Sequence, residues 1–394
     1  DADRAALGAL VAAAGYLALS GGAIATQRAF IMAAVGLTAL MLDRRVLSLR
    51  SVAIAAVVVL ILRPEALLSP GFQMSFAATT ALVAVFELVS RSEWRLPKWA
   101  NAVFGVALSS AVAGAATGPV GMAHFNQIAS YGLLANLISV PVMGMVVVPA
   151  GVLSALLMPF GLAWVGFWIM GLGLDWILWV AHLVADWPGA TRPVVAPAPW
   201  VLPVLALAGL ILCLWRGRGR LAGLAPLALA VMGWITTDRP DVLIADSGTL
   251  VGVLTAQGRA LSRARGSGFV ASPWLATDGF AGQQADAAAL WPQPVDNRIA
   301  RKALPEGSLI HLQGKRAAQA VTRCERHDIV VASVETSLPG GCLLLIPSVL
   351  QQTGSVAFYI ENGHMRLVTD AALTGRRLWH PDRLSRGTRI AKAQ

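Results

Sequence analysis

Charged residues are scarce in this chain of 394 residues. Asp, Glu, Lys and Arg make up 13% of the sequence, against roughly 25% in a typical soluble domain. Hydrophobic residues make up 56%. An apolar excess of this size excludes a fold that is water-soluble throughout, because so much apolar surface needs lipid as its solvent.

Cysteines are few, and a nucleotide-binding loop is missing. Three cysteines are too few for the disulfide framework of a small secreted domain. No Gly-Lys-Ser or Gly-Lys-Thr sequence occurs, which excludes a phosphate-binding loop of that type. The chain begins at Asp1, without the basic segment, short apolar stretch and cleavage site of a signal peptide. We therefore expect this sequence to be a piece of a longer protein.

Apolar stretches dominate the first 235 residues. About 20 apolar residues are needed to cross a bilayer as a helix. Nine stretches reach this length or approach it, near residues 5–21, 24–42, 50–62, 71–89, 101–117, 131–158, 162–186, 200–215 and 221–235. Pro141 and Pro149 interrupt the sixth stretch, which is either one span or two broken halves. The pattern predicts a polytopic α-helical membrane domain over residues 1–235.

The net charge is +10, and cations gather in the connections between predicted spans. Three clusters fall on one side of the membrane when the spans are counted: Arg44, Arg45 and Arg50; Arg91, Arg95 and Lys98; Arg216, Arg218 and Arg220. The connections near residues 63–70, 118–130 and 187–200 fall on the other side and hold few cations. Because cytoplasmic loops carry the Lys and Arg excess, we expect everything after Trp234 to be non-cytoplasmic.

The sequence changes character after Thr236, where polar residues become frequent and long apolar runs stop. Short apolar segments typical of strands occur at residues 241–245, 250–255, 328–333 and 342–347. An Asn-Gly pair that begins at Asn362 predicts a hairpin over residues 356–368. We expect residues 236–394 to form a small α/β or mostly β soluble domain.

Ionisable residues occur inside the seventh predicted span. Asp175, His182 and Asp186 are separated by seven and four residues, which puts them on one helix face. A polar side chain within a span usually faces the interior of the bundle. Two interpretations remain open: a polar stripe that lines a pathway, or a structural Asp–His pair that locks two helices, with Asp186 at the membrane surface.

Polar residues also occur where the fourth span begins. Gly71 is interpreted as permitting a sharp turn after Pro70, and Gln73 and Ser75 would then lie in or near hydrocarbon. Arg28 lies early in the second span. Its guanidinium would either contact a phosphate through two hydrogen bonds or reach out to lipid headgroups, and the two interpretations are evenly balanced.

The connection at residues 118–127 is too apolar for a free surface loop and contains His124 and Asn126. It is predicted to re-enter the membrane, which is tolerated where the backbone is buried or lines water. Asn136 and Pro141 follow in the sixth stretch. Each of these residues alone is typical of contacts between helices, whereas together they favour a pore or translocation path.

Several of these runs carry a family resemblance. They are Thr26–Met32 with Arg44–Arg45, Arg63–Pro64 before Gly71–Ala77, and His124–Asn126 before Asn136 and Pro141. Over roughly residues 1–235 the chain resembles the competence domain of ComEC proteins. These are inner-membrane channels that pass single-stranded DNA into the cytoplasm during natural transformation.

The C-terminal part looks like a degenerate metallo-β-lactamase-like domain, which many ComEC proteins carry. Asp241–Gly248 stands where the first strand and the Asp-containing turn of that fold would stand, and Trp274–Gly279 is similar to alphaproteobacterial relatives. A two-metal hydrolase of this fold needs a His-x-His-x-Asp-His cluster with further ligands. The histidines after residue 236 are isolated: His311, His327, His364 and His380. We therefore expect no metal, no cofactor and no enzymatic activity.

Cys324 and Cys342 both lie in the predicted soluble domain. A disulfide between them is permitted if that domain is non-cytoplasmic, and two buried free thiols are the alternative. We favour the disulfide, because two cysteines in a small oxidised domain tend to pair. Cys213 lies in a predicted span and is interpreted as inert packing.

The resemblance implies a path for single-stranded DNA through the membrane domain. The residues expected to line it are Arg28, Gln73, Ser75, His124, Asn126, Asn136, Asp175 and His182. Other competence proteins are implied as partners, including a separate cytoplasmic ATPase, and a homo-oligomer is compatible with the sequence. Two other functions stay open. One is a secondary transporter of a small solute with Asp175 and His182 as its proton relay, and the other is a membrane-anchored hydrolase.

Overall fold

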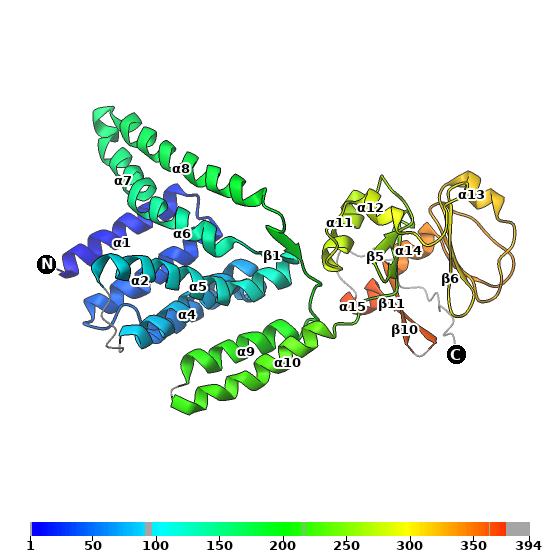
Figure 1. Cartoon of the computed structure of the whole chain (residues 1–394), viewed down its shortest axis with the longest axis horizontal. Coiled ribbons are helices and arrows are strands. Elements are labelled where there is room, and N and C mark those ends of the chain that lie inside the picture. Colours follow the sequence, from blue (N-terminus) through cyan, green and yellow to red (C-terminus); the bar gives the residue numbers. More distant parts are fainter. Residues whose placement is uncertain (1, 91–96, 216, 362, 376–394) are drawn as a thin grey trace. The chain divides into compact units, whose positions relative to one another are not determined.

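The computed structural model describes residues 2–90, 97–215, 217–361 and 363–375 (Figure 1). The chain divides into two compact units. The membrane unit contains Asp1–Arg192 and Ala196–Thr236, and the C-terminal unit contains Pro193–Val195 and Thr237–Gln394. The boundary along the sequence therefore lies one residue beyond the predicted end of the membrane domain.

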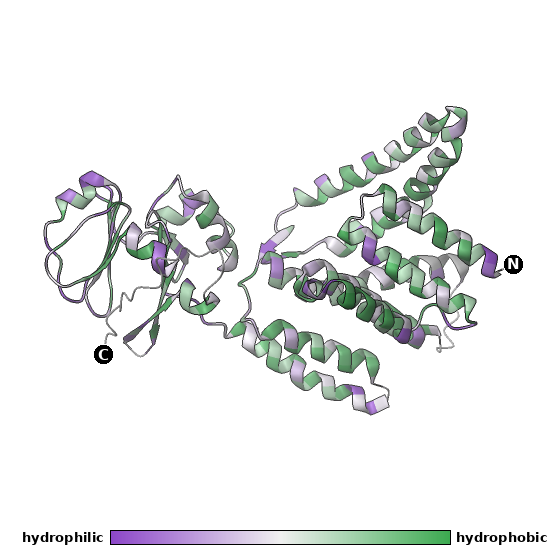
Figure 2. Ribbon diagram, turned by 180° about the vertical axis from the view of Figure 1, so that it is seen from behind, coloured by the Kyte–Doolittle hydropathy of each residue, from purple (hydrophilic) through white to green (hydrophobic). Residues whose placement is uncertain are grey.

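The membrane unit is built from helices. In chain order they are α1 (Ala2–Leu19), α2 (Ile24–Met41), α3 (Leu49–Leu62), η1 (Pro64–Leu68), α4 (Pro70–Ser90), α5 (Lys98–Phe125), α6 (Gly132–Val142), η2 (Met143–Val147), α7 (Val148–Leu157), η3 (Met158–Phe160), α8 (Ala163–Ala185), α9 (Val201–Leu214), η4 (Gly217–Gly223) and α10 (Leu224–Ile235). Hydrophobic residues occupy most sides of these helices (Figure 2). Such helices need apolar surroundings on all faces, which lipid provides.

Five described helical segments are long and apolar enough to cross a membrane. They are residues 24–41, 70–90, 103–125, 132–160 and 163–185. The helices α3 and α9 are apolar but have 14 residues each, or about 21 Å at 1.5 Å per residue. The prediction of nine spans therefore exceeds the five that satisfy both criteria, although every predicted stretch contains a helix. The polytopic membrane architecture itself is confirmed.

One connection of the membrane unit differs from the sequence-based expectation, and one open alternative is decided. Residues 118–125 continue α5 as a helix, so the prediction of a re-entrant loop at residues 118–127 is wrong. The apolar side chains that argued against a surface loop lengthen the span instead. The sixth stretch is one helical segment, residues 132–160, in which the π-helical turn η2 lies between α6 and α7, between Pro141 and Pro149. Each proline removes a backbone hydrogen bond from the helix, which favours a change of helix type here.

A two-stranded sheet joins two connections of the membrane unit. The strand β1 (Gln127–Ala129) follows α5 and pairs with β2 (Thr191–Pro193), which follows α8. The Tyr131 hydroxyl also donates to the Pro188 carbonyl oxygen at 3.1 Å. Because the two connections are paired, they lie at the same end of the helices. The distribution of Lys and Arg among the connections requires the same arrangement.

The C-terminal unit contains two sheets. The larger has the strand order β11-β10-β3-β4-β5 and is antiparallel. The smaller has the order β6-β7-β8-β9, in which β7, β8 and β9 run parallel. The strands are β3 (Val242–Ile244), β4 (Val251–Thr255), β5 (Gly258–Leu261), β6 (Ile299–Ala303), β7 (Ser308–Leu312), β8 (Ile329–Ala332), β9 (Leu343–Leu345), β10 (Val356–Glu361) and β11 (His364–Thr369). The helices are α11 (Gly268–Thr277), α12 (Gln284–Ala289), α13 (Lys315–Ala320), α14 (Pro347–Thr353) and α15 (Asp370–Thr374).

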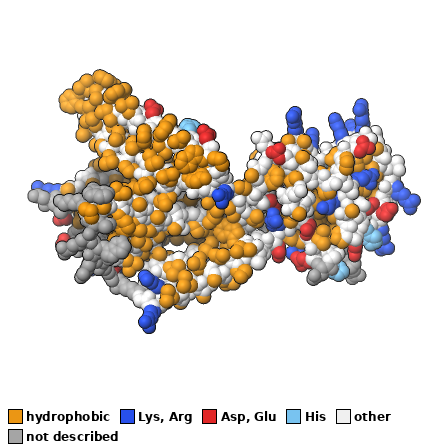
Figure 3. Space-filling model, viewed as in Figure 1, with side chains coloured by type: hydrophobic (Ala, Val, Ile, Leu, Met, Phe, Trp, Pro, Cys, Tyr) orange, Lys and Arg blue, Asp and Glu red, His pale blue; other side chains and the backbone are white. Residues whose placement is uncertain are grey.

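The expected small α/β domain is confirmed in outline. The strands β3, β4, β8 and β9 lie within predicted segments, and β10 and β11 form the predicted hairpin. Buried residues of both sheets share one core, which includes Ile244, Val253, Leu309 and Val331. Figure 3 shows the Lys, Arg, Asp and Glu side chains on the surface of this unit. An apolar core between two sheets and a charged surface are together typical of a water-soluble domain.

Candidate polar site of the membrane unit

Gln73 and His124 are joined by a side-chain hydrogen bond. Gln73 lies in the first turn of α4, and His124 lies in the last turn of α5. The Gln73 Nε2 donates to the Leu67 carbonyl oxygen at 3.0 Å. Its Oε1 is therefore the atom that accepts from the His124 Nε2, at 2.9 Å. One partly buried amide thus ties η1 to the end of α5.

Arg28 lies against the start of α4. A Cβ atom added at Gly71 would be 3.0 Å from each terminal nitrogen of the Arg28 guanidinium. Glycine therefore leaves the room that the guanidinium occupies. Gly71 lies inside α4 and has no positive φ, so the prediction that it permits a sharp turn is wrong. The Arg28 Nε is buried and has no hydrogen-bond partner among the described residues.

Asn126 ends α5. Its φ of 56° and ψ of 32° lie in the left-handed region, which asparagine tolerates better than most residues. The backbone N–H donates to the Met122 carbonyl oxygen at 3.0 Å. The side-chain Nδ2 is buried and makes no hydrogen bond with the residues that the structure describes. Asn126 therefore adds an amide donor without a partner, two residues beyond His124.

The first turns of α4 contact three other helices. Phe72 and Phe76, which are four residues apart, are buried in a core with Val59 of α3. The Met74 Cε lies 3.5 Å from the Cβ position of Gly121 in α5. With the contact to α2 described above, this short run fixes how α2, α3 and α5 meet. Residues 71–76 therefore have a structural role in helix packing, whatever their role in function.

Arg28, Gln73, His124 and Asn126 are referred to hereafter as the polar cluster. They come from the beginning of α2, the beginning of α4 and the end of α5. Consecutive helices from α2 to α5 pack against one another (Figure 1), and chain direction alternates between such neighbours when their connections are short. The cluster therefore lies at one end of the helices. It contains one cation, Arg28, and several N–H donors. Arg28 forms no ion pair with a carboxylate of the described residues. This chemistry suits an anion.

The other predicted path residues lie elsewhere. Ser75 is partly buried on α4, two residues after Gln73. Asn136 is exposed on α6, and Asp175 and His182 are exposed on α8. The structure therefore places half of the predicted set at one end of the helices, and a role in a DNA path stays a prediction for all eight residues.

The prediction that the polar stripe of α8 faces the interior is wrong. The buried residues of this helix repeat every seven positions and are Gly166, Gly173 and Val180. A Cβ atom at Gly173 would lie 2.7 Å from the Val147 side chain, so this face packs on η2. Asp175 and His182 each follow a buried position by two residues, which is about 200° around the helix, and they point away. The His182 Nδ1 donates to the Leu178 carbonyl oxygen of its own helix, at 2.8 Å.

A buried histidine network joins the two sheets of the C-terminal unit. His311 on β7 is fully buried, and its Nε2 donates to the Gly248 carbonyl oxygen at 3.0 Å. Its Nδ1 is 2.8 Å from the Ser262 hydroxyl, which accepts from the Val251 N–H at 3.0 Å. Burial lowers the pKa of His311 to about 4, against the opposing effect of the Gly248 hydrogen bond. The imidazole is therefore neutral, so it serves as a bridge within the core rather than as a cation.

Metal ligands were expected to be lacking in the C-terminal unit. Within the described ranges of the chain, no group of three or more His, Cys, Asp and Glu residues could hold a metal ion. His327 and His364 are exposed, and His380 lies outside the described residues. The absence of enzymatic activity stays a prediction.

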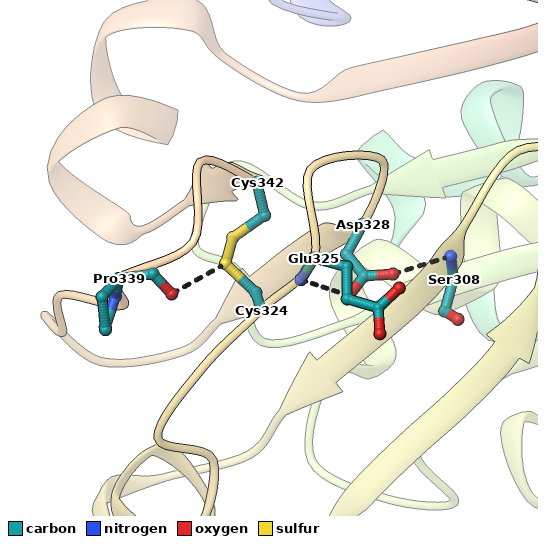
Figure 4. Close-up of a disulfide and its surroundings, with 6 residues drawn as sticks. All are labelled: Ser308, Cys324, Glu325, Asp328, Pro339 and Cys342. Carbon is teal, nitrogen blue, oxygen red and sulfur yellow. Dashed lines mark hydrogen bonds between the residues drawn. A yellow bond between two sulfur atoms is a disulfide. The ribbon is translucent and has the colours of Figure 1, made fainter.

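Cys324 and Cys342 form a disulfide (Figure 4). Their Cα atoms are 5.8 Å apart, and the bond closes the segment that contains β8. Asp328 lies in the same segment, and its carboxylate accepts from the backbone N–H groups of Ser308 at 3.0 Å and Glu325 at 2.9 Å. The disulfide and the Asp328 carboxylate therefore both fix the conformation of the segment between Cys324 and Cys342.

Comparisons with known proteins concern the membrane unit. A family model described as "Competence protein" matches residues 2–219, which is more than half of the chain. ComE operon protein 3 of Bacillus subtilis (strain 168) is 27% identical over 192 residues, which are 48% of this chain. The match spans only 24% of the length of that relative. No solved structure matches the chain, so the metallo-β-lactamase-like fold of the C-terminal unit stays a prediction. On the family match, and in agreement with the ComEC resemblance, the chain belongs to the competence protein family.

Proposed function

We propose that this protein forms part of a channel that carries single-stranded DNA across the inner membrane into the cytoplasm during natural transformation. Its family supports this function. The observation that carries the proposal is the polar cluster, in which the Gln73–His124 hydrogen bond lies at the same helix ends as an Arg28 without an ion-pair partner among the described residues. A polyanion needs such a cationic and hydrogen-bonding route, because charge in hydrocarbon is costly.

The proposal includes an orientation for the C-terminal unit. The loop-charge pattern of the sequence favours the periplasmic side for this unit. The Cys324–Cys342 disulfide supports the same side, because disulfides persist in oxidising compartments such as the periplasm. The polar cluster lies at the end of the membrane unit where β1 pairs with β2, which is then the periplasmic end. DNA would meet the cluster as it enters.

The proposal also needs a motor and a fate for the second strand. No phosphate-binding loop occurs in the sequence, so we infer that a separate cytoplasmic ATPase drives transport. We further infer that the C-terminal unit does not cleave DNA, because its sequence lacks the His-x-His-x-Asp-His cluster that a two-metal site of this kind requires. Binding or guiding of DNA by this unit, without hydrolysis, is compatible with its surface.

Transformation frequency tests the proposal. The variants Gln73→Ala and His124→Ala would be expressed in a naturally transformable strain that lacks its own copy. We expect each to lower transformation by at least tenfold, because each removes one side of the same hydrogen bond. The double variant should lose little more than either single variant, since the two residues act as a pair.

A matched control comes from α5 itself. The Thr117 hydroxyl donates to the Ala113 carbonyl oxygen of its own helix at 2.8 Å. Thr117→Ala therefore removes a polar group from the same helix without touching the polar cluster, and it should transform at the wild-type frequency. Membrane levels of all variants would be measured by immunoblot. Wild-type transformation by both Gln73→Ala and His124→Ala would leave the proposed channel without support from this site.

A further inference from the structure

Arg28 is a cation for which the described part of the membrane unit provides no ion-pair partner. The ion pairs found among the described residues are Arg259–Asp278 and Arg366–Glu361, and both lie in the C-terminal unit. The Arg28 Nε is buried and unpartnered, and the side chain as a whole is only partly exposed. Glu65 in η1 is exposed and forms no ion pair with it. A buried N–H donor without an acceptor is costly, so an acceptor outside the described residues is expected for this nitrogen.

The backbone next to the Arg28 guanidinium has a free donor of its own. Pro70 begins α4 and has no N–H. The Phe72 N–H donates to the Ser69 hydroxyl at 3.2 Å, and the Gln73 N–H donates to the Ser69 carbonyl oxygen at 3.2 Å. The Gly71 N–H is left without an acceptor among the described residues. Gly71 is also the residue whose missing side chain admits the guanidinium.

The position of Arg28 beside the start of α4 favours an anion there. The N-terminus of a helix carries a partial positive charge, and a cation beside it is repelled. Here the guanidinium lies directly against that end of α4, a helix of 21 residues. Folding tolerates such a contact when a third group of negative charge offsets both. The unpartnered Asn126 Nδ2 adds a further donor at the same end of the helices.

We propose that Arg28 and the first turn of α4 form a subsite for one phosphodiester group. The guanidinium supplies two parallel N–H donors, which match two oxygens of a phosphate. The Gly71 N–H supplies a third donor. The inference rests on the proposed function for its source, which is the backbone of single-stranded DNA. The same phosphodiester chemistry occurs in lipid headgroups, and the experiment distinguishes the two.

The salt dependence of DNA binding measures this contact. The full chain would be placed in maltoside detergent, which contains no phosphate, and binding of fluorescent oligo(dT) would be followed by anisotropy over a range of salt concentrations. Loss of one phosphate contact on a single strand reduces the slope of log K against log salt by about 0.7. We expect this change in Arg28→Gln and a smaller change in Arg28→Lys, which keeps the charge but loses the planar fork.

Two further variants separate local geometry from net charge. Arg45→Gln removes a cation from the connection at the opposite end of α2, and it should leave the slope unchanged. Gly71→Ala keeps every charge but places a methyl group 3.0 Å from both terminal nitrogens of Arg28. It should weaken DNA binding by roughly tenfold at low salt, because the guanidinium is displaced. Thermal unfolding of each variant in detergent checks that the helices remain folded.

A second arm adds phosphatidylglycerol to the same detergent and contains no DNA. If phosphatidylglycerol raises the unfolding temperature of the wild-type chain but not of Arg28→Gln, and the DNA slope is the same in both, the phosphodiester belongs to lipid and the subsite stands. If neither the slope nor the lipid effect depends on Arg28, the subsite is refuted. If the wild-type chain binds no oligo(dT), the proposed channel function fails, and the lipid arm alone decides the subsite.

Discussion

Gln73 and His124 are 51 positions apart in the sequence, yet their side chains are 2.9 Å apart in the structure. The contact depends on the length of α5. If residues 118–125 formed a re-entrant loop, as their composition favours, His124 would have no fixed position relative to α4. Because these residues continue the helix, α5 holds the His124 imidazole at the start of α4. Gln73 and His124 meet for this reason.

The Gln73–His124 pair should contribute measurably to the stability of the membrane unit. Hydrogen bonds between membrane helices have coupling energies of about 0.6 kcal/mol on average. A double-mutant cycle with Gln73→Ala and His124→Ala, measured by thermal unfolding in detergent, should give a coupling of this size. Additive effects of the two substitutions would mean that the bond does not form in the folded protein.

Acid should destabilise the C-terminal unit through His311. Its pKa is lowered to about 4 in the folded chain, against about 6.5 when unfolded. Between these values the unfolded state binds more protons, so stability is complete above pH 6.5 and falls as the pH drops to 4, by about 3 kcal/mol. Hydrogen exchange in peptides that contain β7, corrected for the intrinsic rate, would follow this loss. His311→Gln should lower protection at neutral pH and flatten its pH dependence.

Reduction of the Cys324–Cys342 disulfide should loosen the loop that it closes. The two cysteines are 18 residues apart, and a disulfide that closes a loop of this length contributes about 3 kcal/mol in the chain-entropy account. Maleimide should label the two cysteines only after reduction and unfolding, whereas Cys213 in α9 is a free thiol in both cases. Ready labelling of Cys324 in chain made by cells, without reductant, would contradict both the bond and the proposed periplasmic location.

Asp175 offers a test of what surrounds α8. An ionised Asp that faces lipid near the middle of a span costs about 2.5–3.5 kcal/mol on insertion scales. Asp175→Leu should therefore raise the unfolding temperature in lipid nanodiscs if the exposed face of α8 meets hydrocarbon. A lower unfolding temperature would indicate that another protein surface or water covers this face. Loss of small-solute flux in Asp175→Asn, with DNA uptake intact, would instead favour the transporter alternative.

Metal content discriminates between a DNA channel and a membrane-anchored hydrolase. We expect far less than one metal ion per chain when the purified full-length protein is analysed by mass spectrometry after dialysis. The His residues of the C-terminal unit should also be replaceable one at a time without loss of transformation, apart from His311, whose loss acts through folding. Stoichiometric zinc or manganese would support the hydrolase alternative.

The sequence predicted element types well and side-chain directions less well. Apolar runs of about 20 residues identify helices because lipid leaves few other solutions for the backbone, and the Asn-Gly pair identifies the β10–β11 hairpin. Which face of a helix is buried depends on its neighbours, and that information is tertiary. Asp175 and His182 share a face, as their spacing requires, but the buried face of α8 is set by Gly166 and Gly173 against α7 and η2. The spacing of Asp175 and His182 does not determine which face of α8 is buried.

Gly71 illustrates a second limit. Its neighbours Pro70 and Ser69 are typical of a turn, so the sequence favours a role in chain direction. Its actual role is steric, and it depends on a side chain 43 positions earlier in the chain. Likewise, the hydrogen bond from Gln73 to the Leu67 carbonyl oxygen leaves no trace in composition or periodicity, because any residue offers a carbonyl.

The close approach of α7 and α8 has a mechanical consequence. A methyl group at Gly166 would lie 2.7 Å from the Ala150 carbonyl oxygen, so the two backbones are nearly in contact and cannot slide past each other without a steric clash. Because α8 also packs on η2 through Gly173, α7, η2 and α8 form one closely packed hairpin. Asp175 and His182 lie on the exposed side of this hairpin, so labels at these two positions would report on what surrounds it.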